Sequence, residues 1–373
     1  MKTTCNKTSF GMLYAIFFFY SLIFSTGCGS KEPDVPDFPE IPENIARELE
    51  EMNRPKPTTV WSDFTYPTDQ QNLLQTNRPG IYQPTAAGSL ISALYGSVRT
   101  VKRGKRFSSS FHEGLDIAAL QRDRKGRPTD PIYAVADGHV AYVNKIAGNS
   151  SYGKYVVLLH DDAMGTIYTL YAHLSRVDVK KGDTIQAGAQ LGIMGNTATY
   201  KIPMQRGHLH FEIGIMLNRH FKQWFKKQKL KPDHGNFNGW NLLGVNPYNF
   251  MQSLEREPNQ TMSAFFETIP TAFTCVVKSK KRPDYFSIYP TRWQGDPYNG
   301  TAFTMACCEN GIPLWGRNAT EEECGHLNKN QSAAVLKANE DVLGRNGRHL
   351  AIKKKGKRIF SNAGKKHLKM LLY

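Results

Sequence analysis

The sequence predicts an all-β catalytic domain, a twisted antiparallel sheet or sandwich, over residues 58–255. Between Tyr82 and Phe250, short runs of alternating β-branched and aromatic residues are separated by turns at Gly, Asp and Asn. Such runs cover residues 131–136, 139–143, 155–160, 166–171 and 208–213. Alternation predicts strands with one buried face, and no ten-residue amphipathic helix is expected among them. Consecutive short strands of this kind pack as an antiparallel sheet or sandwich.

Length, composition and charge limit the number of domains and the kind of partner that can be expected. The chain has 373 residues, of which 40% are hydrophobic and 21% charged, which is enough for two compact domains. The formal net charge of +16 favours an anionic partner, such as nucleic acid, a membrane surface or cell-wall polymer. No nucleic-acid-binding motif is present in the sequence, so no nucleic acid is expected as a partner.

The N-terminus has the layout of an export signal, residues 1–27. Lys2 and Lys7 precede an apolar run, Met12 to Phe24, that is short for a helix that stays in a bilayer, which needs about 20 residues. The segment Ser25-Thr26-Gly27-Cys28 resembles a bacterial lipobox. That resemblance implies lipidation of Cys28 and a membrane anchor facing the periplasm, with the outer membrane favoured. An ordinary signal peptide with an incidental cysteine is the alternative.

Two segments outside the catalytic domain differ from it in composition. Residues 28–57 are rich in Pro, Glu and Asp and predict a flexible tether. Residues 260–373 predict a small C-terminal domain of unknown class with a basic tail at 345–369. That tail is interpreted either as a solvated or disordered end, which is the favoured interpretation, or as a docking element for anionic wall polymer or lipid.

The chain has six cysteines, of which Cys5 lies in the signal segment and Cys28 is the expected lipidation site. The other four lie in the C-terminal region. In an exported protein, such a cluster predicts two disulfides with three possible connectivities. A metal site is the alternative, but the adjacent pair lacks the C-x-x-C spacing of structural zinc sites. The candidate disulfide residues are Cys275, Cys307, Cys308 and Cys324.

Polar residues that a core would not need occur in the middle of the chain. His112 and Asp116 lie four residues apart, His208 and His210 project from the same face of one strand, and His173 ends another. Two histidines and one carboxylate can bind a catalytic zinc ion that keeps a position for water. The metal would lower the pKa of that water toward about 7. Each motif alone is weak, and the prediction rests on their joint appearance.

Residues 107–214 resemble the LytM/lysostaphin-type peptidases, zinc endopeptidases of bacterial peptidoglycan. The resemblance is carried by ordered blocks: residues 111–117, 131–138, 152–157, 168–174, 179–192, 195–197 and 207–212. It implies a fold of the duplicated-hybrid-motif type and one Zn²⁺ bound by His112, Asp116 and His210. It also implies catalytic roles for His208 and His173, with His208 favoured as the general base, although the two roles could be exchanged.

The expected function is therefore zinc-dependent hydrolysis of peptide cross-links in peptidoglycan by a metal-activated water. A non-catalytic wall-binding scaffold that activates another hydrolase, and a wall-binding structural lipoprotein, are the alternatives. Two departures from the family bear on substrate preference: a longer loop at 199–206 and an insertion at 218–245. The insertion is interpreted equally as a surface hairpin or as a wall of the substrate cleft.

Overall fold

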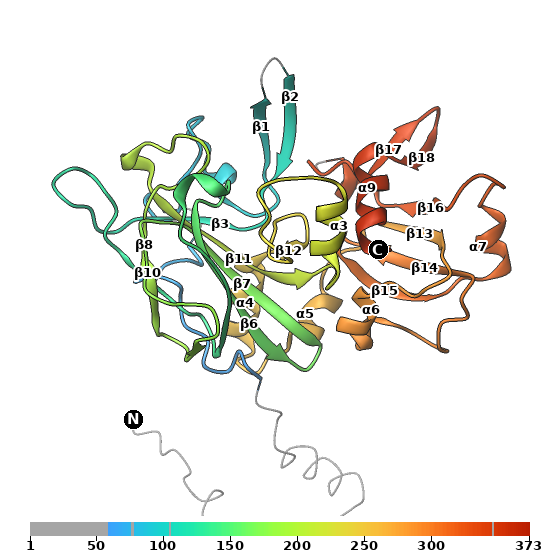
Figure 1. Ribbon diagram of the computed structural model, residues 1–373, viewed down its shortest axis with the longest axis horizontal. Helices are drawn as coiled ribbons and strands as arrows, with labels where there is room; N and C mark the ends of the chain where they lie inside the picture. The colour runs from blue at the N-terminus through green and yellow to red at the C-terminus, as the bar shows by residue number, and fades with distance from the viewer. Residues whose placement is uncertain (1–58, 76–77, 104–105, 345–346) are drawn as a thin grey trace, which may run out of the picture. The chain divides into compact units, whose positions relative to one another are not determined.

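The computed structural model describes residues 59–75, 78–103, 106–344 and 347–373, which belong to one compact unit, Lys56–Tyr373 (Figure 1). The predicted signal peptide, Cys28 and the predicted tether lie outside the described residues. Within the described ranges, no helix is long and apolar enough to cross a membrane. The division into domains at 58–255 and 260–373 stays a prediction.

The central element is a seven-stranded antiparallel sheet, which agrees with the predicted fold class. Its order is β12-β11-β7-β6-β5-β9, with β3 pairing on β11. The strands are β3 (Leu115–Ala118), β5 (Gly138–Asn144), β6 (Lys154–Asp162), β7 (Gly165–Leu174), β9 (Thr184–Ile185), β11 (His208–Met216) and β12 (Leu242–Val245). Because β3, β7 and β11 are buried almost throughout, polar side chains on them are held away from bulk water.

Smaller elements surround this sheet. A three-stranded antiparallel sheet has the order β4-β10-β8, and β1 pairs with β2 as a hairpin. Their bounds are β1 (Val98–Arg103), β2 (Arg106–Phe111), β4 (Pro131–Tyr133), β8 (Arg176–Val177) and β10 (Gln190–Ile193). Three 3₁₀ turns, η1 (Leu90–Ala93), η2 (Ala147–Asn149) and η3 (Met204–Arg206), lie in the connections.

Helices appear where strands or a hairpin were expected. The insertion at 218–245 contains helix α3 (Phe221–Lys227), which buries Phe221, Trp224 and Phe225. The predicted β region ends in helix α4 (Pro247–Arg256), so the expectation of strands alone up to Phe250 was wrong there. The Asn246 side chain caps α4 by accepting from the Tyr248 N–H at 3.1 Å, and Pro247 occupies the first turn.

The C-terminal region has an α+β architecture around a four-stranded antiparallel sheet, β15-β14-β13-β16. Figure 1 shows these strands gathered together beside α3 and β12. The strands are β13 (Phe273–Lys278), β14 (Ala302–Cys307), β15 (Pro313–Asn318), β16 (Ala333–Ala338), and the hairpin β17 (Ala351–Lys354) and β18 (Lys357–Phe360). The helices are α5 (Met262–Glu267), α6 (Tyr285–Ile288), η4 (Pro290–Arg292), α7 (Glu321–Gly325), α8 (Glu340–Leu343) and α9 (Asn362–Leu371).

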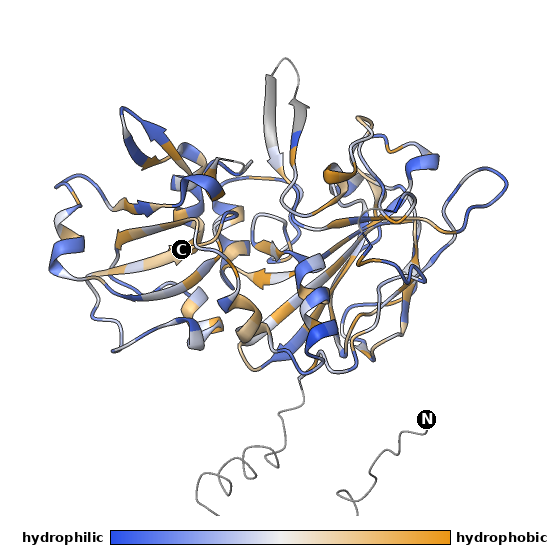
Figure 2. Cartoon of the chain, turned by 180° about the vertical axis from the view of Figure 1, so that it is seen from behind, coloured by the Kyte–Doolittle hydropathy of each residue, from blue (hydrophilic) through white to orange (hydrophobic). Residues whose placement is uncertain are grey.

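One apolar core continues from the central sheet into the C-terminal sheet. Phe211 and Ile215 of β11 belong to the same buried cluster as Tyr285 and Phe303. Hydrogen bonds reinforce the junction, since the Tyr289 hydroxyl donates to the Thr166 carbonyl at 2.8 Å and accepts from the Met216 N–H at 2.9 Å. Hydrophobic residues concentrate in the strands of the sheets, and the β17–β18 hairpin is hydrophobic at its base and hydrophilic toward its tip (Figure 2).

Two expectations for the C-terminal region were wrong. The two predicted disulfides are absent, and the structure has free thiols at all four positions: Cys275, Cys307, Cys308 and Cys324. The end of the chain is folded where a disordered tail was favoured: α9 carries many lysines but buries His367, Leu368 and Leu371. The basic residues therefore coat an amphipathic helix whose other face packs on the core.

Candidate metal centre

Strand register brings two of the expected ligands together. Residue His210 on β11 lies directly opposite Asp116 on β3 and opposite Ala172 on β7. Side chains opposite one another on paired strands have Cβ atoms about 5 Å apart. Although 94 positions separate them in the chain, the His210 Nδ1 atom is 2.9 Å from Asp116 Oδ1.

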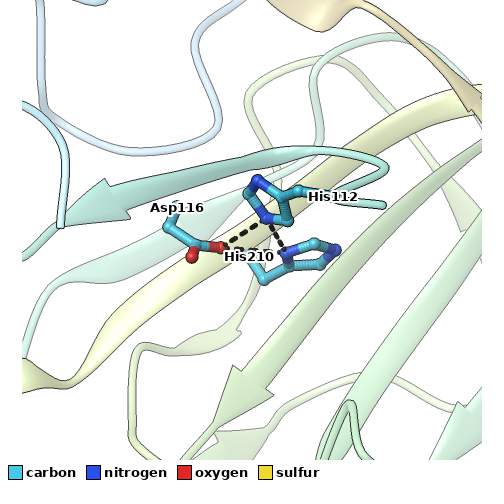
Figure 3. A group of neighbouring side chains, drawn as sticks. All are labelled: His112, Asp116 and His210. Atoms are coloured by element: carbon cyan, nitrogen blue, oxygen red, sulfur yellow. Dashed lines mark hydrogen bonds and ion pairs between the residues drawn. The ribbon is translucent and has the colours of Figure 1, made fainter. Parts of the chain in front are cut away.

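The third residue, His112, comes from the turn that leads into β3. At Gly114 in this turn, an added Cβ would lie 2.2 Å from the Phe211 carbonyl oxygen, so only glycine fits. This close approach presses the turn against β11. As a result, His112 Nε2 lies 3.0 Å from Asp116 Oδ1 and 3.1 Å from His210 Nδ1 (Figure 3).

The outward nitrogens of both imidazoles are held by oxygen atoms. His112 Nδ1 lies 2.9 Å from the Leu94 carbonyl, and a carbonyl can only accept, so Nδ1 donates and Nε2 keeps its lone pair. His210 Nε2 lies 2.8 Å from Glu212 Oε1, which leaves the lone pair of Nδ1 directed at the centre. Two nitrogen lone pairs and one carboxylate oxygen thus converge, a donor set that suits zinc.

A buried acid holds the outer side of His210. Glu212 is fully buried, and its Oε1 also accepts from the Tyr152 hydroxyl while Oε2 accepts from Tyr168, both at 2.8 Å. Burial alone would lower the pKa of His210, but its hydrogen bonds to Asp116 and Glu212 outweigh this and raise the pKa to about 9. The position between the two carboxylates therefore favours a cation, either a proton or a metal ion.

A guanidinium holds the remaining oxygen of Asp116. Arg99 Nη2 donates to Asp116 Oδ2 at 2.6 Å, and Arg99 Nε donates to the Ser92 carbonyl at 2.9 Å. Burial alone would raise the pKa of Asp116, yet the facing imidazoles of His112 and His208 hold it well below its usual value. The carboxylate is thus ionised, with Oδ1 directed at the histidines.

The two histidines expected to act in catalysis lie next to this centre and to each other. His173 and His208 have ring centroids 4.9 Å apart, and the His173 ring centroid is 5.9 Å from that of His210. His208 Nδ1 donates to the Arg206 carbonyl and His173 Nδ1 to the Thr197 carbonyl, both at 2.8 Å. Each ring therefore presents Nε2 as a lone-pair atom, that of His208 lying 3.5 Å from Asp116 Oδ1.

The backbone of His173 is strained. Its φ of 63° lies in the left-handed region, which a non-glycine residue occupies at some cost. Burial, together with the neighbouring imidazoles of His208 and His210, lowers the pKa of His173 well below its usual value. The ring is accordingly neutral near pH 7, with the lone pair of Nε2 available to accept a hydrogen bond.

The structure brings together all five residues that the sequence singled out, but it also adds partners that sequence reasoning missed. Glu212 could have been found, because positions 208, 210 and 212 of one strand share a face. Arg99 and the carbonyls of Leu94 and Thr197 had no such signal, since they come from a hairpin and loops distant in sequence. The Arg206 carbonyl is two residues from His208, but it lies before the strand, where side-chain alternation says nothing about it.

Comparison with known proteins locates this geometry within a family. Residues 110–223 match the model of Peptidase family M23. The chain is 38% identical over 84 residues to the peptidoglycan DD-endopeptidase ShyA of Vibrio cholerae, a match that covers 22% of this chain and 17% of that protein. It is 32% identical over 110 residues to the lipoprotein NlpD/LppB homolog of Pseudomonas aeruginosa, covering 29% of this chain and 31% of that one.

Among solved structures, the chain is similar to the catalytic domain of the antimicrobial peptidase lysostaphin from Staphylococcus simulans. It is 21% identical, covers 43% of this chain and 89% of its own length, and has a TM-score of 0.29. The match covers less than a third of the length of either of these two curated relatives. Residues 110–223 form a peptidase family M23 domain.

Proposed function

We propose that this M23 domain makes the chain a zinc-dependent endopeptidase that hydrolyses peptide cross-links of bacterial peptidoglycan. The observation that carries the proposal is the convergence of His112 Nε2, His210 Nδ1 and Asp116 Oδ1, which lie within 3.1 Å of one another with their outward atoms held by other groups. These three residues would bind the ion. Bound zinc would supply Lewis acidity to the scissile carbonyl and make a water molecule more acidic.

The roles of the other two histidines follow from their free nitrogens. His208 Nε2 accepts a proton from the attacking water and returns it to the leaving amine nitrogen. His173, neutral and close to His208, orients that water by accepting a hydrogen bond from it at Nε2, and it donates to the developing oxyanion only after it takes up a proton at that nitrogen. The Arg206 and Thr197 carbonyls keep both rings in the tautomer that this requires.

The substrate and the location are proposed on separate grounds. Peptidoglycan is supported by the similarity to a named peptidoglycan DD-endopeptidase. An acylated Cys28 would attach the chain to a membrane facing the periplasm, and the match to a named lipoprotein supports that placement. A lipoprotein facing a periplasmic wall would meet direct cross-links between D-amino acids, not glycine bridges.

The test is zinc content together with cleavage of cross-linked muropeptides, measured on the purified chain and on His210→Ala. We expect one zinc per chain and chelator-sensitive cleavage, both lost in the variant. A matched control is His139→Ala, an exposed histidine on β5 of the same sheet, which should retain both.

The opposite result is equally informative. A folded wild-type protein that binds wall material but neither binds zinc nor cleaves would contradict the enzyme and support the scaffold alternative. Cleavage restricted to oligoglycine bridges would retain the enzyme and overturn the proposed cross-link.

A further inference from the structure

A cavity of about 710 Å³ lies between the family-atypical insertion and the C-terminal helix α9. Phe225 and Trp240 of the insertion line it from one side, and Lys366 and Met370 of α9 line it from the other. Its volume lies in the range of about 300–1,000 Å³ that is usual for ligand pockets. The M23 match ends at residue 223, so most of this lining comes from outside it.

The cavity is positively charged. Its lining contains three side-chain cations, Lys231, Arg348 and Lys366, but a single carboxylate, that of Glu113. Arg348 forms an ion pair with Glu113, which leaves Lys231 and Lys366 without a carboxylate partner among the described residues. A ligand that carries a negative charge would compensate them.

Lys366 is held in place without being neutralised. Its Nζ lies 3.1 Å from the centroid of the Trp240 ring and 5.9 Å from that of Trp224. Contacts between an ammonium and an aromatic face orient the charge but leave its N–H groups able to donate. Trp240 remains 37% exposed, so its indole also offers an apolar surface.

The cavity is also close to the metal centre. Tyr152 lines it, and the Tyr152 ring centroid is 5.6 Å from that of His210. Glu113, another lining residue, directly follows His112 in the chain. An extended peptide advances about 3.3–3.6 Å per residue, so a peptide bond at the metal centre and a group a few residues away could occupy both places.

We propose that this cavity is a substrate subsite that binds the carboxylate-bearing arm of the cross-linked peptide, with Lys366 and Lys231 contacting the carboxylate and Trp240 packing against the peptide. The proposal rests on the proposed function, because it assigns the arm of the peptide next to the scissile bond. It also gives the insertion and α9 one shared role.

The experiment is calorimetric binding of a stem tetrapeptide with free carboxylates, and of the same tetrapeptide with every carboxylate amidated, to the full chain. The variants are Lys366→Met, which keeps the aliphatic stem beside Trp240, and the exposed Lys231→Met. The matched control is Lys365→Met, the neighbouring exposed lysine of α9 that lines a different cavity. Circular dichroism checks that each protein is folded.

We expect the dissociation constant for the free-acid peptide to rise about tenfold in either variant and to stay unchanged in the control. The amidated peptide should bind wild type about as weakly as the free acid binds Lys366→Met. Equal binding of both peptides to wild type, or equal weakening by Lys365→Met, would overturn the proposal.

Cleavage assays on the same proteins separate the two claims. If the chain cleaves cross-links and the lysine variants change neither binding nor KM, the subsite is wrong and the peptidase stands. If the chain binds the free acid through Lys366 but cleaves nothing, the subsite stands and the peptidase is wrong.

Discussion

The central sheet and the C-terminal sheet both bury side chains that can bind metals or form covalent bonds. The two sheets differ in how strand register places these side chains relative to one another. On the central sheet, His210 pairs directly with Asp116, and their functional atoms meet at 2.9 Å. On the C-terminal sheet, Cys275 pairs with Met305 and Cys307 pairs with Phe273, so the cysteines lie diagonally. Direct pairing thus brings the functional atoms of His210 and Asp116 together, whereas the paired positions of Cys275 and Cys307 are offset by two residues.

The chemical state of the buried groups differs in the same way. Burial raises the pKa of Cys307 well above its usual value and that of Cys308 to about 12, so these thiols are protonated and poorly nucleophilic. In the metal centre, by contrast, His112 keeps a lone pair on Nε2, and His210 Nδ1 faces Asp116 across a position that favours a proton or a metal ion. Buried polar groups therefore converge on one candidate metal centre in the central sheet, whereas in the C-terminal sheet they are protonated thiols within the core.

The two regions are nevertheless connected. Asn310, fully buried after β14, donates from Nδ2 to the Gly244 carbonyl at 2.7 Å and to Glu113 Oε2 at 3.2 Å. Glu113 adjoins the candidate metal ligand His112 and also accepts from the Gly244 N–H at 2.8 Å. The C-terminal region thereby supports the turn that carries His112.

The largest effect is expected at the centre itself. In Asp116→Ala, cross-link cleavage should fall at least about a thousandfold, which corresponds to about 4 kcal/mol of barrier, while wall binding is retained. Initial rates and pull-down with insoluble wall measure the two quantities. The matched control is Asp161→Ala, an exposed acid on β6. Cleavage at the wild-type rate in Asp116→Ala would remove the metal centre from the mechanism.

A second effect concerns pH and a buried histidine away from the centre. His160 is fully buried, and its Nδ1 donates to the Asp137 carbonyl at 2.6 Å. Burial lowers its pKa to about 4, whereas the unfolded chain takes up this proton near pH 6.5. Because the unfolded state then binds more protons, stability falls as pH drops from about 6.5 to 4, by about 3 kcal/mol.

Urea denaturation of chelator-treated wild type and His160→Gln at several pH values measures this contribution, because the metal-site histidines are common to both proteins. The free energy of unfolding of the variant should fall less between pH 7 and 4.5. Parallel curves for the two proteins would show that His160 does not titrate as described.

A smaller effect tests the connection between the sheets. Replacing Asn310 by Ala removes the donor to Glu113 and Gly244, which should cost about 1–3 kcal/mol of unfolding free energy. It should also weaken zinc binding, since it loosens the turn before His112. Denaturation and competition with a chelator measure both. Asn299→Ala, at an exposed turn, is the control. Unchanged zinc affinity in a destabilised Asn310→Ala would confine Asn310 to folding.

The smallest expected effect is that of a reducing agent. Because the cysteines are free, dithiothreitol should leave the unfolding free energy unchanged. Loss of a native disulfide would cost about 2–5 kcal/mol. The disulfide prediction would be restored if dithiothreitol lowered the unfolding free energy by that amount and the untreated protein had correspondingly fewer free thiols. The cysteines of the C-terminal sheet would then converge, as the side chains of the central sheet do.

The sequence by itself determined the strands of the central sheet and the residue types of the centre. Alternating hydrophobicity is a local property, so β5, β6, β7 and β11 could be predicted from their own residues. His208 and His210 share a face because successive side chains of a strand alternate. Local signals also existed for α4, in Asn246 and Pro247, although the prediction did not use them.

Only the tertiary structure decided which groups meet. Arg99, the Leu94 carbonyl and Glu212 orient the donor atoms, and Asn310 reaches the same turn from 197 positions away. Tertiary structure likewise decided that the cysteines are free. It also decided that the lysine-rich end of the chain, predicted as a solvated or disordered tail, forms helix α9 with one face packed on the core. Contacts distant in sequence depend on strand register and packing, and neither is encoded in the pattern of one segment alone.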